Sequence, residues 1–157
     1  MRKQNFLAKL KEEGKLELVE PSNEISNSYL DKSLNSLKAA QLLFDEDLLE
    51  ESTSMAYYSM YHCLVALMRK CGIKCENHTG NILLLKNLFS ENELYQIISF
   101  AKEERIDKQY YIDLRIMRGE VEELIEKAQD FTIRIKEIVE KLKNEDIEKI
   151  REKFKLV

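Results

Sequence analysis

The clearest pattern of hydrophobic and polar positions lies between residues 117 and 142. Apolar residues recur there at alternating steps of four and three, with charged residues between them. They are Met117, Val121, Leu124, Ala128, Phe131, Ile135, Ile138 and Leu142. This period predicts one long amphipathic helix, about 39 Å in length at the standard rise per residue. The stripe can pack inside one bundle or form a seam with a second subunit, and both readings stay open.

A second segment, residues 52–68, contains no Asp, Glu, Lys or Arg. Apolar and aromatic side chains surround it on every side, which is typical of a helix buried among other helices. Its hydroxyls, three tyrosines and His62 make it too polar for a membrane span. Buried phenols and an imidazole require hydrogen-bond partners. The segment therefore predicts a central helix that carries a polar network or lines a site.

Start and stop signals divide the remaining chain into further helices. Pro and Ser at 21–22 favour a helix start, acidic residues favour the beginning of the central helix, and Gly72 favours its end. Ser90 and Glu93 have the spacing of a capping box. The helices expected from these signals begin near Pro21, Glu50, Thr79, Ser90 and Met117.

Both ends of the chain stand apart from this pattern. Residues 1–21 contain a short amphipathic piece broken by Gly14, and we expect a loosely attached arm. After Leu142 the period breaks and then restarts, which predicts a separate helical tail. The expected organisation is an arm at 1–21, a helical bundle at 22–143 and a tail at 144–157.

The composition favours an all-α class. The chain has 157 residues, enough for one domain with a real core. Four glycines and one proline leave little turn chemistry for hairpins or sandwiches.

Charge and cysteine content narrow the class of partners and the compartment. The net charge of −4 argues against the sequence-independent phosphate binding of strongly basic proteins. No secretory signal or membrane span is recognisable, so we expect a cytoplasmic protein. Its three cysteines are then expected to be reduced thiols.

Several short motifs resemble those of the HEPN domain family. The resemblance covers about residues 24–142 and is greatest to small stand-alone bacterial and archaeal members. It rests on Leu42-Leu43-Phe44, Tyr57-Tyr58-Ser59-Met60-Tyr61-His62, His78-Thr79-Gly80 and Ala128-Gln129-Asp130-Phe131. The resemblance implies an up-and-down bundle of four to five helices, usually a homodimer. It also implies a minimal nucleotidyltransferase as partner, or metal-independent RNase activity in toxin–antitoxin systems.

The chain departs from the pattern of the active RNases in that family. Those relatives carry an arginine, four to six intervening residues and a histidine, and no such pair occurs here. Arg69 and His78 are separated by eight residues that include Gly72. The family's Arg-x-x-Ala-Asp-Tyr element has Gln109 where the aspartate usually stands.

One candidate for catalysis lies on the central helix. Tyr58, His62 and Arg69 fall on one helix face, because they are four and seven residues apart. A histidine beside a cation and a phenol can bind phosphate and transfer protons during RNA cleavage. The alternative is a structural role, in which His62 is a buried side chain bonded to a tyrosine or a carbonyl.

A second candidate site interleaves cations with aromatic residues near the junction of two helices. This composition can contact phosphates and stack a base. We assign nucleotide or RNA binding to Arg105, Lys108, Tyr110, Tyr111 and Arg115, together with His78 of the family-like motif. The alternative is a solvated junction that is neutralised by neighbouring acids.

Metal and cofactor motifs are weak. Cys71, Cys75 and His78 suit zinc by residue type, but no second Cys/His pair follows at the usual spacing. No phosphate-binding glycine loop is recognisable. We therefore expect neither a metal nor a cofactor.

The sequence as a whole favours a binding module over an enzyme. The leading hypothesis is a homodimeric HEPN-like module that binds a protein partner, a minimal nucleotidyltransferase, in a toxin–antitoxin-type pair, with RNA or nucleotide as a further ligand. The alternative hypothesis is a metal-independent ribonuclease toxin.

Overall fold

The structure is a computed structural model that describes residues 2–110 and 116–157. In that part of the chain, helices account for nearly all regular structure, which confirms the all-α class. The elements in chain order are α1 (Arg2–Glu12), β1 (Leu16–Leu18), α2 (Asn23–Asp45), α3 (Leu49–Lys70), β2 (Ile73–Cys75), α4 (His78–Phe89), α5 (Asn92–Tyr110), α6 (Arg118–Lys141) and α7 (Asn144–Phe154).

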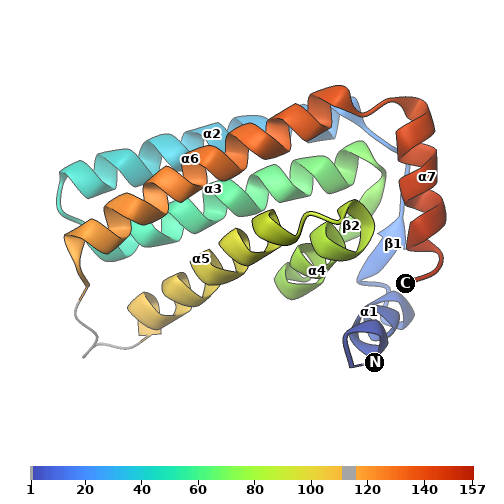
Figure 1. The fold of residues 1–157 in the computed structure, drawn as a ribbon, viewed down its shortest axis with the longest axis horizontal. Coiled ribbons are helices and arrows are strands. Elements are labelled where there is room, and N and C mark those ends of the chain that lie inside the picture. The colour runs from blue at the N-terminus through green and yellow to red at the C-terminus, as the bar shows by residue number, and fades with distance from the viewer. Residues whose placement is uncertain (1, 111–115) are drawn as a thin grey trace.

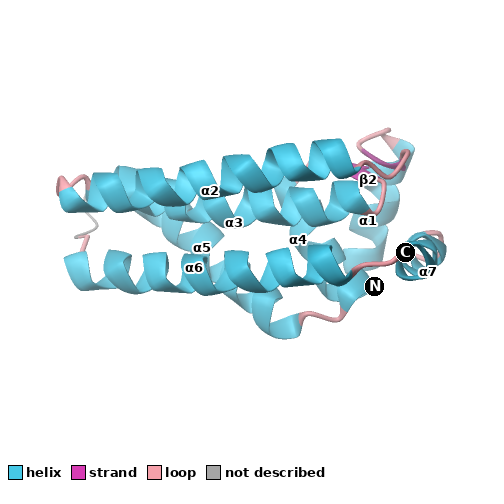
Figure 2. Cartoon of the chain, turned by 90° about the horizontal axis from the view of Figure 1, so that it is seen from above, coloured by secondary structure: helices cyan, strands magenta, loops and turns pink. Residues whose placement is uncertain are grey.

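Helix α3 lies at the centre of the bundle. It packs against α2 and α6 on one side and against α4 and α5 on the other (Figure 1). Figure 2 shows the long helices α2, α3 and α6 running side by side, with α7 turned away at one end. Residues such as Tyr57, Met60 and Leu64 of α3 are fully buried. The uncharged central segment is therefore a core helix, as its composition predicts.

Serine hydroxyls join α2 to α3. Each hydroxyl donates to a backbone carbonyl of the facing helix, so these buried polar groups are satisfied without separating the helices. The donors and acceptors are Ser26 with Ala66 at 2.9 Å, Ser33 with Ser59 at 2.6 Å and Ser52 with Ala40 at 2.7 Å. The small side chains at these positions allow the two helices to pack closely along their length.

The helix ends follow most of the sequence signals. Ser22 caps α2 by accepting from the Ile25 amide, and Gly72 follows α3 with a φ of 71°. Ser90 differs from expectation. It takes a φ of 55° as the C-terminal cap of α4, instead of opening the next helix, which begins at Asn92.

The heptad stripe of α6 packs inside the bundle. Val121, Phe131 and Ile135 are buried to 1% exposure or less, whereas Met117 at the start of the stripe is 48% exposed. The structure thus favours the first of the two readings, core packing, for most of the stripe. The following break and restart correspond to α7, a separate helix.

The N-terminal segment is packed tightly, so the expectation of a loose arm was wrong. Leu7 is fully buried, and β1 pairs antiparallel with β2, which joins residues far apart in the sequence. The ammonium of Lys11 donates to the Phe154 carbonyl at 2.8 Å and also to the carbonyl of Val157. Segments from both ends of the chain therefore close the same end of the bundle.

Within the described residues, no helix combines the length and the apolar character needed to span a bilayer.

Candidate functional site

Two consecutive turns of α3 place four aromatic rings on two neighbouring faces. Residues four apart lie on the same face of a helix. Tyr57 therefore stacks with Tyr61, with ring centroids 6.0 Å apart, and Tyr58 stacks with His62 at 5.9 Å. The first pair is buried, whereas the second remains partly exposed.

His78 is held against the buried pair. It is the first residue of α4, whose start is capped by Asn77. The Tyr57 hydroxyl and His78 Nδ1 are hydrogen-bonded at 2.8 Å, and the Tyr61 ring stacks on the imidazole with centroids 3.8 Å apart. The Tyr61 hydroxyl accepts from Asn81 Nδ2 at 2.8 Å. These contacts fix the imidazole ring and leave Nε2 as the nitrogen that Tyr57 does not use.

Two cations of α5 complete the site. The Arg105 guanidinium lies over both tyrosine rings, 5.4 Å from the centroid of Tyr57 and 5.3 Å from that of Tyr58, and it donates to the Tyr58 hydroxyl at 3.2 Å. One turn earlier, Lys102 donates to the Thr79 hydroxyl at 2.6 Å. Helices α3, α4 and α5 thus meet in a cationic aromatic cluster. The cluster consists of Tyr57, Tyr58, Tyr61, His78, Lys102 and Arg105.

The cluster is positively charged near neutral pH. Burial lowers the pKa of His78, and the charges of Lys102, Arg105 and His62 lower it further. Burial also raises the pKa of Tyr57 and raises that of Tyr61 to about 12, so both phenols stay neutral. A neutral imidazole and neutral phenols therefore surround two cations. Because Tyr58, His78, Lys102 and Arg105 are partly exposed, a ligand can reach them.

The proposed catalytic residues are only partly brought together. Tyr58 and His62 are in ring contact, but Arg69 lies about 10 Å farther along the helix axis. Within the described residues, no hydrogen bond or ring contact joins Arg69 to His62. The His62 Nδ1 atom has no hydrogen-bond partner among the described residues, so this nitrogen does not make the bond to a tyrosine or carbonyl that the alternative reading requires.

The residues predicted to bind a nucleotide are in part brought together. Arg105 and His78, which are far apart in the sequence, meet in the cluster. The side chains of Lys108 and Tyr110, and Tyr111 and Arg115 entirely, lie outside the described residues. Sequence reasoning missed Lys102, Tyr57 and Tyr61 as members of the site. The spacing of Lys102 from Arg105 and of Tyr57 from Tyr61 was a signal in the sequence, but it pointed to a shared site only once the packing of α3 against α4 and α5 was known.

The cysteines and histidines do not form a recognisable metal site. Among the residues that the structure describes, no three His, Cys, Asp or Glu side chains are grouped as ligands. Burial raises the pKa of the Cys71 thiol to about 12, and the Cys75 thiol donates to the Asn77 carbonyl. His78 Nδ1 is already bonded to Tyr57. The arrangement therefore assigns no metal to these residues.

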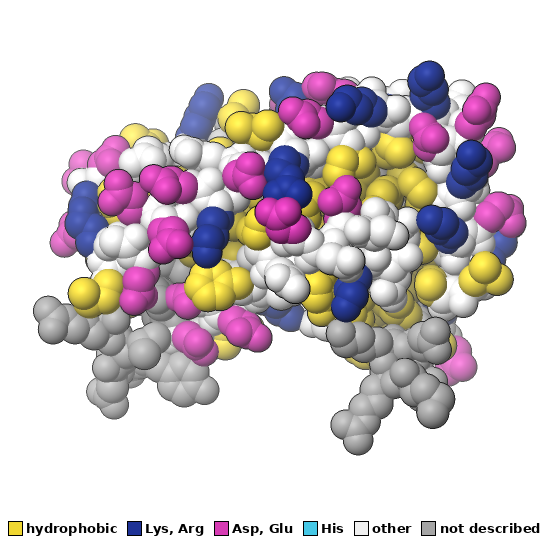
Figure 3. Space-filling view, viewed as in Figure 1, with side chains coloured by type: hydrophobic (Ala, Val, Ile, Leu, Met, Phe, Trp, Pro, Cys, Tyr) yellow, Lys and Arg dark blue, Asp and Glu magenta, His cyan; other side chains and the backbone are white. Residues whose placement is uncertain are grey.

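One face of the molecule carries mixed charges and shows neither histidine. Figure 3 shows a face on which acidic and basic side chains alternate and neither histidine is visible. The charges on that face are mixed, as on an ordinary solvated surface.

The histidines should make the stability of the fold depend on pH. Burial lowers the pKa of both His62 and His78. Below the unfolded-state value of about 6.5, the unfolded chain binds more protons than the folded one, so stability falls as the pH falls towards the folded-state values. We expect a lower melting temperature at pH 5 than at pH 7, and a weaker dependence in the double variant His62→Gln, His78→Gln. Equal pH slopes in circular dichroism melts of the two proteins would contradict this.

Comparison with known proteins identifies related sequences. The family model described as the HEPN domain matches residues 26–142. "Putative toxin MJ0142" of Methanocaldococcus jannaschii is 27% identical over 107 residues, covering 65% of this chain and 73% of that protein. "Putative toxin MJ0605" of the same organism is 28% identical over 112 residues, covering 68% and 82%. "UPF0332 protein glr0978" of Gloeobacter violaceus is 36% identical over 55 residues, covering 35% and 44%. The family match runs from the first turn of α2 to the end of α6, which is the part of the fold that carries the cluster.

Proposed function

The chain belongs to the HEPN domain family, and we propose that it is a toxin-like HEPN module that binds RNA or nucleotide at its cationic aromatic cluster. The observation that carries the proposal is the position of Arg105 over two tyrosine rings, next to Lys102 and His78. Cations neutralise phosphates, and exposed aromatic faces stack bases without requiring a particular sequence. The names of the two archaeal relatives support a toxin-like role.

The arrangement of side chains in the cationic aromatic cluster favours single-stranded over double-stranded RNA as the ligand. Tyr58 is partly exposed with the Arg105 guanidinium over its ring, so a ligand that reaches the cluster meets an aromatic side chain and a cation at one place. Unpaired bases can stack on such side chains, whereas bases in a duplex are already stacked on each other. The net charge of −4 over the chain also argues against binding along an extended duplex.

Replacing Arg105 by alanine should weaken RNA binding without unfolding the protein. We expect the affinity for a fluorescein-labelled single-stranded RNA to fall about tenfold or more, because a phosphate contact and a stacking plane are lost together. The matched control is Arg134→Ala, which removes an arginine of α6 that pairs with Glu93 and lies outside the cluster. Fluorescence anisotropy at low and high salt measures both variants. Equal affinities of the two variants would contradict the proposed site.

The proposal includes a protein partner. The family resemblance implies a cognate minimal nucleotidyltransferase, which would pair with this chain in a toxin–antitoxin-type system. RNA binding at the cluster and partner binding elsewhere are compatible, because the cluster occupies only the junction of α3, α4 and α5. Copurification of the co-expressed pair tests this part of the proposal.

A homodimer is also part of the proposal. The partly exposed stripe of α3 beside the cluster, which contains Met55, His62 and Val65, offers a largely apolar surface for a second copy. Because most of the α6 stripe is buried within the bundle, α3 is the more suitable contact. Such a dimer would bring two copies of the cluster near each other on one side of the assembly.

A further inference from the structure

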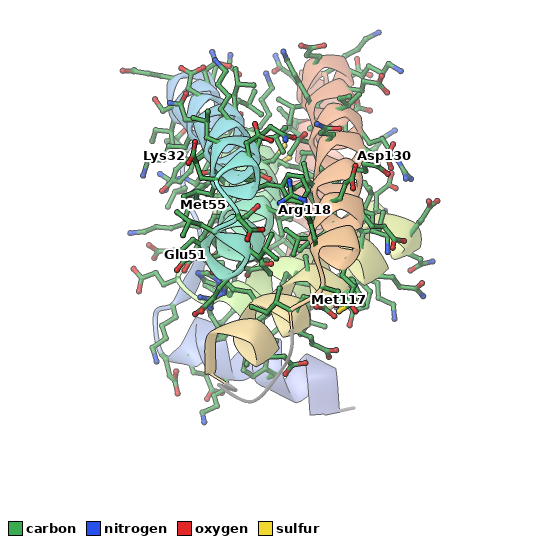
Figure 4. The ribbon with its side chains drawn as sticks, turned by 90° about the vertical axis from the view of Figure 1, so that its left-hand side faces the viewer. Lys32, Glu51, Met55, Met117, Arg118 and Asp130 are labelled. Carbon is green, nitrogen blue, oxygen red and sulfur yellow. The ribbon has the colours of Figure 1, made fainter. Side chains whose placement is uncertain are left out.

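An apolar groove runs between α2 and α6, and α3 contributes Cys63 to its larger hollow. In the view of Figure 4, the two helices stand side by side, with Lys32 and Met55 on the outer side of the α2–α3 pair and Asp130 on the outer side of α6. The groove contains a hollow of about 560 Å³ and a smaller one of about 170 Å³, and Gln129 lines both. Together they extend from Asn27 to Phe44 along α2, about 25 Å of helix.

The walls of the groove expose large apolar side chains. Leu34 of α2 is 52% exposed and Ile133 of α6 is 59% exposed, and they line the same hollow. Leu30 and Leu37 continue the apolar wall of α2, and Cys63 of α3 lies at the floor. Apolar side chains gathered along a groove of this length are typical of a surface that binds another helix.

The charges along the groove are mainly acidic. The described residues that line it include four carboxylates and one ammonium group. They are Asp31, Glu122, Glu126, Glu140 and Lys136. A second copy of the chain related by a two-fold axis would place the same acidic residues against each other, which costs free energy. The charge pattern therefore favours a basic ligand over self-association on this face.

We propose that the α2–α6 groove binds an amphipathic helix of a partner protein. The apolar stripe of that helix would cover Leu34 and Ile133, and its flanks would carry Lys and Arg opposite the acidic rims. The length of the groove fits a helix of about five turns. This inference rests on the proposed function only in requiring a protein partner, and it uses no residue of the cationic aromatic cluster.

The test uses the full-length protein and a labelled peptide of about 18 residues. Its Leu residues recur at steps of three and four, and Lys residues occupy the other positions, so that a helix would be apolar on one face and basic on the other. Two control peptides have the same composition in scrambled order, or Glu in place of Lys. We expect the basic amphipathic peptide to bind about tenfold more tightly than either control, and its affinity to fall as salt is raised. The double variant Leu34→Ser, Ile133→Ser should lose about tenfold in affinity for it.

The matched control is the double variant Leu42→Ser, Leu156→Ser, which removes two exposed leucines that do not line the groove. It should bind the basic peptide as the parent protein does. Absence of binding, equal binding of the acidic peptide, or unchanged affinity of the Leu34→Ser, Ile133→Ser variant would each overturn the inference.

Light scattering distinguishes self-association through the groove from partner binding, and RNA binding distinguishes the groove proposal from the RNA-binding proposal. The parent protein and the Leu34→Ser, Ile133→Ser variant should have the same mass in solution. If this variant alone turns a dimer into a monomer, the groove binds a second copy and the partner helix is refuted. RNA binding should be unchanged in the variant, so failure of the peptide test leaves the RNA-binding proposal standing, and the reverse is also true.

Discussion

Replacing Gly72 by alanine is expected to lower the free energy of unfolding by about 3–5 kcal/mol. Gly72 has a φ of 71°, a conformation that costs a residue with a Cβ about 1–2 kcal/mol. A Cβ at this position would also overlap Arg151 Nη1 and the Val19 carbonyl oxygen. Neither is free to move without loss of other contacts.

The Arg151 guanidinium of α7 contacts two backbone segments at this point, the residue after β1 and the turn after α3. Its Nη1 donates to the carbonyls of Val19 at 2.8 Å, Cys71 at 3.0 Å and Gly72 at 3.0 Å. Hydrogen bonds from a charged donor contribute about 1.5–3 kcal/mol. Displacing this side chain would therefore detach α7 from the turn after α3, at the end of the bundle where both chain ends pack.

Substitutions at two other glycines separate the cost of the backbone conformation from the cost of the overlap with Arg151 and Val19. Gly14 has a φ of 73° but nothing within 4 Å of the position of a Cβ, so Gly14→Ala measures the conformational cost alone. Gly119 lies in α6 with the same free space, and Gly119→Ala should be neutral or slightly stabilising. Urea denaturation followed by circular dichroism measures all three. If Gly72→Ala costs no more than Gly14→Ala, the contacts of Arg151 do not stabilise the fold as described.

Local signals predicted most of the helices because the information lies within each segment. Ser22 and Gly72 mark the ends of their helices through their own side-chain and backbone chemistry. The strands β1 and β2 could not be predicted in this way. Each has only three residues, and each becomes a strand by pairing with the other, at a separation that no local pattern reveals.

The same distinction explains the outcome for the site. The contact between Tyr58 and His62 follows from their spacing on one helix. The pairing of Tyr57 with His78, and of Tyr58 with Arg105, depends on how α3, α4 and α5 pack. Arg69 shows the limit of the helical-face argument, because a shared face does not bring side chains two turns apart into contact.

Purified protein is expected to bind single-stranded RNA and leave it intact. Metal-independent cleavage needs one group to deprotonate the 2′-hydroxyl, another to protonate the leaving oxygen, and a cation to stabilise the phosphorane. The cluster supplies cations, but burial and the neighbouring positive charges lower the pKa of His78. At neutral pH this imidazole is therefore mostly unprotonated and poorly suited to protonate the leaving oxygen. Burial and Lys32 also lower the pKa of His62.

The measurement incubates a labelled RNA with micromolar protein for several hours, with and without a chelator, and resolves the products on a denaturing gel. Full-length RNA should be recovered with the parent protein, with His62→Ala and with His78→Ala. A matched DNA oligonucleotide, which lacks the 2′-hydroxyl, serves as the control for contaminating nucleases that cut both polymers. RNA-specific cleavage that persists with the chelator and disappears in either histidine variant would refute the binding-only proposal. The ribonuclease hypothesis would then replace it, because the observed loss would assign proton transfer to that imidazole.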